Sequence, residues 1–321
     1  WDQQHIKKIT VDVDSTVLER YGKKQQGVVK GYNPKRPGGV SHRPLMAFCD
    51  ELKMVINAWM RPGNASETGD ASIFLKHLLE ITPAHRIGLL RGDAGFYSGE
   101  FMDTLEEEKV PYVIRGKLTS PLLNRIVRIK EWYPDDSVFE GAQYAELHYK
   151  SKEWTRSRRV VVVRRPRKEQ DGQQLLLGDE VMHKHYEIGV FFTSTILAAS
   201  KLHKLYNQRG ECENRIKELK YDYGIDGFNF KDIAAVDGAF RFVMLAYNIM
   251  ALFKQKCLTN SRSRQQLSTI RFQCIAVGSY LVKSGRNKVL KLAAEGERRH
   301  FLEYFFDQVE HLKPPFKLSA A

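Results

Sequence analysis

Cysteine is scarce in this sequence, and its few positions are not arranged for metal or disulfide chemistry. The four residues, Cys49, Cys212, Cys257 and Cys274, are scattered along the chain and show no CxxC spacing. This argues against a zinc knuckle and against a disulfide framework, and it fits a reducing compartment.

Long apolar runs and a signal peptide are also missing. The most apolar stretch, residues 239–253, is interrupted by Arg241 and Asn248, and we expect it to be too short to span a bilayer. No internal repeat or low-complexity tract is visible. These absences predict a cytoplasmic protein with no membrane partner.

Acidic residues are in deficit, and this imbalance is the first positive signal. The chain has 51 Lys and Arg against 38 Asp and Glu, which gives a formal net charge of +13. Such a surplus attracts polyanions but does not by itself separate DNA from RNA or a membrane surface. A membrane-surface protein would need a basic amphipathic helix with a broad apolar face, whereas the basic clusters here lie in predicted loops and strands.

The first part of the chain, residues 1–115, has the pattern of an α/β domain. Ile9, Val11 and Val13 alternate with polar residues, which is the two-residue period of a strand. Apolar runs and helical spacing predict further strands at 45–49, 54–59, 87–90 and 110–114, and helices near 74–79 and 101–108. Three strands, then helix, strand, helix and strand, is the order of an RNase H-like (retroviral-integrase-like) mixed sheet flanked by helices, although other α/β folds share parts of it.

The remainder divides into three predicted segments. Residues 116–187 form a β-rich insertion with hairpin strands expected at 144–149, 160–163 and 175–177. Residues 188–260 form the second part of the core, with a strand at 188–193 and long helices at 199–221 and 236–256. The C-terminal region, 261–321, mixes a basic hairpin-like segment with a helix near 299–312.

The insertion contains a strongly basic run. Residues 150–168 carry nine bases and one acid, and we favour contact of Arg158 and Arg159 with a DNA backbone over a plain solvated hairpin. Trp154, inside the run, is a candidate to stack on an unpaired base. An aromatic residue in a β-segment more often packs in the core, which is the alternative.

The most specific pattern lies in the predicted helix 199–221. At about 100° per residue, Tyr206, Arg209, Glu213 and Lys220 fall within roughly 60° of one helix face. Such a line places one carboxylate among three phosphate-binding donors. A solvated face of i, i+4 ion pairs is the alternative, and the neighbouring Arg215 and Lys217 are expected to serve solubility.

These residues resemble the DDE transposases of bacterial insertion sequences that carry the YREK signature, because the spacing Y-x2-R-x3-E-x6-K matches at all four positions. Other blocks resemble this class in order and approximate spacing over nearly the whole chain. They are 11–16 (VDVDST), 21–22, 31–33, 42–45, 61–64 (RPGN), 91–96 (RGDAGF), 246–248, Arg271 and 285–286.

The resemblance implies that Asp14, Asp93 and Glu213 form a metal-binding and catalytic triad. Mg²⁺ is the expected cofactor, as two ions with Mn²⁺ as a substitute, since hard cations prefer carboxylate oxygens. Asp12 lies on the same strand face as Asp14; we favour Asp14 because the class places a Thr, here Thr16, two residues after the ligand. For Asp12 the alternative role is capping or ion pairing, and for Asp93 it is capping of the turn before Gly95.

The resemblance further implies DNA-phosphate contacts from Tyr206, Arg209 and Lys220. It implies cut-and-paste transposition on double-stranded DNA, both transposon ends and target, by a protein that is dimeric when assembled on DNA. The location would be the bacterial cytoplasm, associated with the nucleoid. Members of the class usually have a separate DNA-binding region before the first catalytic strand, so recognition of transposon ends is expected to depend on such a region.

Two other functions compete with transposition. A remnant that only binds DNA would keep the fold without the chemistry, and a plain RNase H-fold nuclease would cleave without strand transfer. The intact triad argues against the first, and the insertion with its Tyr, Arg and Lys partners argues against the second. His183 and His185 share a strand face, but without a third ligand we expect a surface pair.

Overall fold

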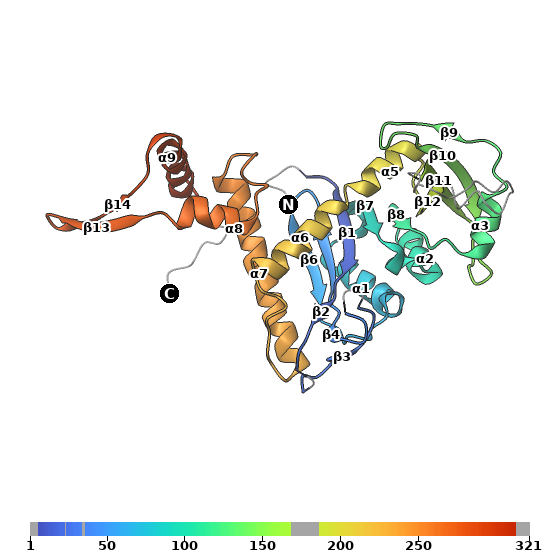
Figure 1. Cartoon of the computed structure of the whole chain (residues 1–321), viewed down its shortest axis with the longest axis horizontal. Helices are drawn as coiled ribbons and strands as arrows, with labels where there is room; N and C mark the ends of the chain where they lie inside the picture. The colour runs from blue at the N-terminus through green and yellow to red at the C-terminus, as the bar shows by residue number, and fades with distance from the viewer. Residues whose placement is uncertain (1–5, 23, 34–35, 168–185, 313–321) are drawn as a thin grey trace, which may run out of the picture. The chain divides into compact units, whose positions relative to one another are not determined.

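The computed structural model describes residues 6–22, 24–33, 36–167 and 186–312 (Figure 1). Its contacts separate two compact units. The first comprises Trp1–Ile216 and Asn229–Gly238, and the second comprises Lys217–Phe228 and Ala239–Ala321. The predicted insertion is therefore not a compact unit of its own. All four cysteines are free and buried.

A nine-stranded mixed sheet forms the centre of the first unit. Its order is β6-β5-β1-β7-β8-β12-β11-β10-β9. The strands are β1 (Ile9–Ser15), β5 (Leu45–Cys49), β6 (Met54–Trp59), β7 (Ile87–Gly92), β8 (Tyr112–Arg115), β9 (Tyr133–Pro134), β10 (Gln143–Tyr149), β11 (Arg158–Pro166) and β12 (Tyr186–Thr193). A small sheet of β2 (Leu18–Glu19), β4 (Val40–His42) and β3 (Val29–Lys30) accompanies it.

Strand direction confirms the predicted RNase H-like core. The neighbours β6, β5 and β1 are antiparallel, whereas β1, β7 and β8 are parallel. In β1 the alternation works as predicted, because Val11 and Val13 enter the main apolar core and Asp12 and Asp14 point to the opposite face. Both faces of β1 are covered, so even its aspartates are buried.

The insertion extends the same sheet. The predicted hairpin strands are β10 and β11, which pair antiparallel from Gln143–Arg164 to Tyr149–Arg158. β12 pairs with β11 over eight residues and with β8 through Phe191–Thr193, so it joins the insertion to the core. Residues 175–177, His183 and His185 lie outside the described residues.

Helices cover both faces of the sheet. α1 (Glu67–Ile81) and α2 (Gly99–Glu107) contribute Phe74 and Phe101 to the core that contains Val11 and Val13. α5 (Ala199–Asn207) packs Leu202 and Tyr206 on the other face. A short helix, α3 (Ser120–Ile126), follows β8, and the 3₁₀ helices are η2 (Ala84–Arg86) and η3 (Ala94–Phe96).

The prediction of one continuous helix over 199–221 is wrong. The chain forms α5 and then α6 (Gly210–Tyr221), with a break at Gln208 and Arg209. At the break the backbone N–H groups of Arg209, Glu211 and Cys212 bond to carbonyls three residues earlier, which tightens the turn. Gly210 adds to the effect because glycine costs about 1 kcal/mol in a helix interior.

The second unit has its own small apolar core. It is built from the end of α7 (Ile233–Cys257), α8 (Leu267–Ile270), the π-helix η5 (Arg271–Ile275) and α9 (Gly296–Glu310), with Phe301, Leu302 and Phe305 at its centre. The buried ion pair of Glu218 and Lys254, at 2.8 Å, lies in the same unit. β13 (Ser279–Ser284) and β14 (Asn287–Leu292) form the predicted basic hairpin.

α7 is longer than the apolar stretch considered from the sequence. It has 25 residues and an 18-residue window with a mean hydropathy of 1.4, so it is long and apolar enough to cross a membrane by length and composition. The helix extends beyond both ends of the stretch 239–253 on which the sequence argument was based. One such helix among the described residues is weak support for a membrane span, because helices of soluble proteins pass the same test.

Candidate active site

Two aspartates stand at the same edge of the central sheet. Asp14 is the next-to-last residue of β1, and Asp93 directly follows β7. The two strands are parallel neighbours, with Val13 opposite Gly92, so their carboxyl ends bring the two side chains to one place. Asp93 also accepts a hydrogen bond from Gly95 N at 2.9 Å, so the turn-capping role is present as well.

Arg209 connects this edge to Glu213. Its guanidinium lies 2.9 Å from Asp14 Oδ2 and 4.0 Å from Glu213 Oε1. Arg209 is buried, whereas 63% of the Glu213 side chain is exposed. The break between α5 and α6 places Arg209 here, and the first turn of α6 carries Glu213 to the same site.

Asp14 lies close to two other acidic side chains and one basic side chain. Burial raises the pKa of its carboxyl to about 7; Arg209 opposes this shift, and the charges of Asp93 and Glu213 add to it. All three groups offer carboxylate oxygens, the donor type that a hard divalent cation prefers. Among the described residues no three metal-ligand side chains stand at metal-binding spacing, and the cation next to the carboxylates is the guanidinium of Arg209.

Asp12 has a different environment from Asp14. It is fully buried and pairs with Arg91 through two bonds, 2.6 Å from Nε and 2.8 Å from Nη2. The pairing follows from the strand register, in which Asp12 is directly opposite Arg91. Asp12 is thus held as a structural ion pair, which leaves Asp14 as the β1 carboxylate that faces Asp93 and Glu213.

Tyr206 does not share a helix with Glu213 as the single-helix prediction required, whereas Glu213 and Lys220 are seven residues apart on α6. Tyr206 belongs to α5, is 7% exposed and packs its ring 4.7 Å from that of Phe191. Lys220 lies in the last turn of α6, in the part that belongs to the second unit. The single helix face inferred for the four signature residues is therefore interrupted between Tyr206 and Glu213, although Arg209 and Glu213 do meet.

The candidate DNA contacts in the insertion are buried or paired. Trp154 is 9% exposed and makes edge contacts with Tyr97, Tyr149 and Phe192. Arg158 is buried and pairs with Asp103 at 2.6 Å and Glu106 at 2.7 Å. The structure does not support stacking of Trp154 on a base or phosphate contact by Arg158, and the packing alternative for Trp154 is the one observed.

Other arginines of the basic run also have protein partners. Arg159 pairs with Glu146 at 2.6 Å and donates to the carbonyls of Thr195 and Leu197. Arg164 lies over Trp132, 3.9 Å from its ring centroid, and Arg165 pairs with Glu187. Much of the charge that the sequence shows in this run is therefore neutralised by acids from distant segments.

Three residues that hold the helices beside the site, Asp50, Arg91 and Arg215, were not given this role from the sequence. Asp50 accepts from Arg91 at 3.1 Å and from Arg215 at 2.6 Å, and Arg91 also donates to the carbonyl of Leu205 at 2.7 Å. This network ties α5 and α6 to the sheet beside the site. Arg215, expected to serve solubility, is in fact buried. The signal that could have revealed the network is Arg91 itself, a charge inside an otherwise apolar strand.

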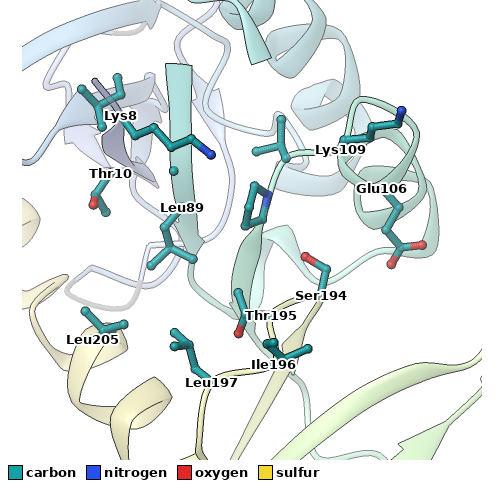
Figure 2. Close-up of a pocket in the computed structure, with 14 residues that line it drawn as sticks. Lys8, Thr10, Leu89, Glu106, Lys109, Ser194, Thr195, Ile196, Leu197 and Leu205 are labelled. Carbon is teal, nitrogen blue, oxygen red and sulfur yellow. The ribbon is translucent and has the colours of Figure 1, made fainter. Parts of the chain in front are cut away.

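A separate pocket of about 740 Å³ lies at the opposite ends of the same strands (Figure 2). Its lining includes Lys8 and Thr10 at the start of β1 and Leu89 near the start of β7. Figure 2 shows Ile196, Leu197 and Leu205 on one side and Lys8 and Lys109 on the other. The carboxylates occupy the other edge of the sheet, so this pocket is not their site.

Two solved structures are similar to the chain at low sequence identity. A cryo-EM structure of the piggyBac transposase synaptic complex with hairpin DNA is similar at 13% identity and a TM-score of 0.47, covering 96% of this chain and 55% of that chain. The chain thus spans about half the length of that transposase chain. A cryo-EM structure of the simian T-cell lymphotropic virus intasome with PP2A regulatory subunit B56 gamma is similar at 11% identity and a TM-score of 0.25, covering 60% of this chain and 84% of that chain. A search of curated proteins gives no match.

A family model matches almost the entire chain. Residues 2–314 match the model described as transposase DDE domain group 1, and the chain therefore belongs to the group 1 family of transposase DDE domains.

Proposed function

We propose that this chain performs metal-dependent DNA strand cleavage and strand transfer, as in cut-and-paste transposition, with Asp14, Asp93 and Glu213 as the catalytic carboxylates. One observation carries the proposal: Asp14 and Asp93 end adjacent parallel strands, and Arg209 pairs with both Asp14 and Glu213. Carboxylates far apart in the sequence thereby converge in an enzyme family that acts on DNA.

Members of this family use divalent metal ions. For this chain we propose Mg²⁺, bound as two ions by Asp14, Asp93 and Glu213, with Mn²⁺ as a substitute. When bound, such ions activate an attacking oxygen and stabilise a leaving oxygen of the phosphodiester. The raised pKa of Asp14 supports a cation site, because a divalent ion would offset the like charges that Asp93 and Glu213 place beside it.

Arg209 has two roles in this proposal. It balances the carboxylates in the arrangement described here, and its fork of donors matches a phosphate oxygen pair. Lys220 remains a proposed phosphate contact, whereas burial of Tyr206 favours a packing role for that ring. The partner is double-stranded DNA, both transposon ends and target, bound by a dimer in the bacterial cytoplasm.

Nicking of supercoiled plasmid tests the proposal. The wild-type chain is expected to nick in Mg²⁺ or Mn²⁺, and Glu213→Gln and Asp93→Asn are expected to lower the rate at least about 100-fold. Glu211→Gln is the matched control, since it removes the same charge two residues away in the same helical turn.

Mn²⁺ titration by calorimetry in the same variants separates the possible failures. If wild type neither nicks nor binds Mn²⁺, the assignment of the triad is wrong. If Glu211→Gln reduces nicking as strongly as Glu213→Gln, the third ligand has been misassigned. Nicking without joining of a supplied 3′-OH end would instead identify a plain nuclease.

A further inference from the structure

The hairpin of β13 and β14 is exposed on both of its faces. Among its twelve strand residues only Val282 and Leu292 are partly covered, and the other ten are exposed. At its base, Val277, Leu292 and Ala294 pack against the apolar core of the second unit, and Ala293 N donates to Gly278 O at 2.7 Å. The ribbon therefore projects from a fixed base, as Figure 1 shows beside α8 and α9.

The hairpin lies in a part of the chain that contains no acid. Between Asp237 and Glu295 the sequence has ten Lys or Arg residues and no Asp or Glu. Four of the ten, Lys283, Arg286, Lys288 and Lys291, belong to the hairpin, and all four are exposed. This differs from the basic run of the insertion, where Arg156, Arg158, Arg159 and Arg165 are paired with acids.

Three of these charges gather at the tip. Lys283 and Lys288 are direct cross-strand partners, so both amines project from the same face, an arrangement that costs stability through like-charge repulsion. Arg286 occupies the two-residue turn next to Gly285, whose φ of +62° suits this tight connection. An anion between the lysines would relieve the repulsion.

Nearer its base the ribbon exposes apolar and aromatic side chains. Tyr280, Leu281 and Leu290 are each more than half exposed, and Lys291 lies 6.0 Å from the Tyr280 ring centroid. A second copy of the chain is a poor occupant for this surface, because two ribbons together would bring eight bases against one another. An extended polyanion that also presents apolar sugar and base edges fits both parts.

We propose that the β13–β14 ribbon is a DNA-binding element that contacts duplex DNA, with Lys283, Arg286 and Lys288 on backbone phosphates. A two-stranded ribbon fits the major groove, which is about 12 Å wide, and phosphate contacts by Lys and Arg supply sequence-independent affinity. The inference rests on the proposed function only for the choice of DNA as partner.

Binding of a labelled duplex in EDTA tests this without any catalysis. The variant K283Q/R286Q/K288Q is compared with K217Q/K256Q/R264Q, which removes the same charge from three exposed positions of the second unit. For the hairpin variant, the slope of log K against log salt is expected to fall by about 3 and the affinity by at least about tenfold. The control variant should change both much less.

Three results would overturn the proposal. Equal losses in the two variants would mean diffuse attraction, and an unchanged hairpin variant would mean no contact. Unchanged DNA binding with a lower mass in sedimentation would assign the ribbon to contact between copies. Since none of the exchanged residues contributes to the core of the second unit, equal melting temperatures are expected. Nicking by wild type is scored separately, so failure of the catalytic proposal remains distinguishable.

Discussion

Asp12 and Asp14 are two residues apart on one strand face, yet the structure gives them opposite roles. The sequence favoured Asp14 as the ligand and left capping or ion pairing for Asp12, but the partner of Asp12 depends on which residue of β7 lies opposite. The register pairs Asp12 with Arg91 and leaves Asp14 near Asp93. The identity of Arg91 as the partner of Asp12 cannot be read from the first strand alone.

This difference predicts unequal costs of substitution. Asp12→Asn leaves the buried charge of Arg91 without its main partner and is expected to lower the free energy of unfolding by about 3 kcal/mol. Asp14→Asn is expected to lower it by less than about 1 kcal/mol, because burial and neighbouring acids already disfavour the charged form of Asp14. Urea unfolding in EDTA measures both, and equal losses would contradict the assigned roles.

His203 gives a pH dependence of stability. Burial, reinforced by the charges of Arg115 and Arg165, lowers its pKa from 6.5 to about 4. The unfolded chain therefore binds a proton between pH 6.5 and 4 that the folded protein excludes, so stability falls as the pH falls through this window.

The variant His203→Gln isolates this contribution. Between pH 7.5 and 4.5 the wild type is expected to lose more free energy of unfolding than the variant, by on the order of 2 kcal/mol. Urea unfolding at the two pH values provides the measurement. Parallel losses in the two proteins would show that His203 does not exclude the proton.

At the level of the elements, the sequence predicted strands better than helix ends. The strands around Val11, Leu45 and Leu90 were identified because their buried faces require continuous or alternating apolar residues. The break between α5 and α6 was missed, since the apolar spacing continues through Arg209 and only Gly210 marks the interruption. The pairing of β12 with both β8 and β11 was also not predicted, because the alternation of apolar residues along a strand does not specify which strands pair with it.

Gly210 offers a test of this junction. A Cβ at this position would meet no atom within 4 Å, so Gly210→Ala is expected to raise the free energy of unfolding by about 0.5–1 kcal/mol through the unfolded chain. Gly116→Ala is the contrasting variant, because its Cβ would lie 2.5 Å from the Phe192 ring and should destabilise the protein. Urea unfolding compares the two; a loss at Gly210 would mean that the junction requires glycine.

For the whole molecule, the net charge of +13 predicted a polyanion partner, and the basic run 150–168 was expected to contact it. The run 150–168 looked exposed because the acids that pair with it, such as Asp103, Glu106 and Glu187, lie tens of residues away. In the stretch without acids before Glu295, Lys254 is paired with Glu218, whereas the four bases of the hairpin are exposed. Composition can count charges, but the fold decides which of them are balanced.

The continuous sheet has a mechanical consequence. Strand ladders run without interruption from β1 and β7, which bear Asp14 and Asp93, through β8 and β12 to β10 and β11. A load applied to the insertion would be carried as shear across those ladders, with no hinge along the path. We therefore expect the insertion and the two aspartates on the strands to move as one rigid body. Any change in the distance between these aspartates and Glu213 would then come from the break between α5 and α6.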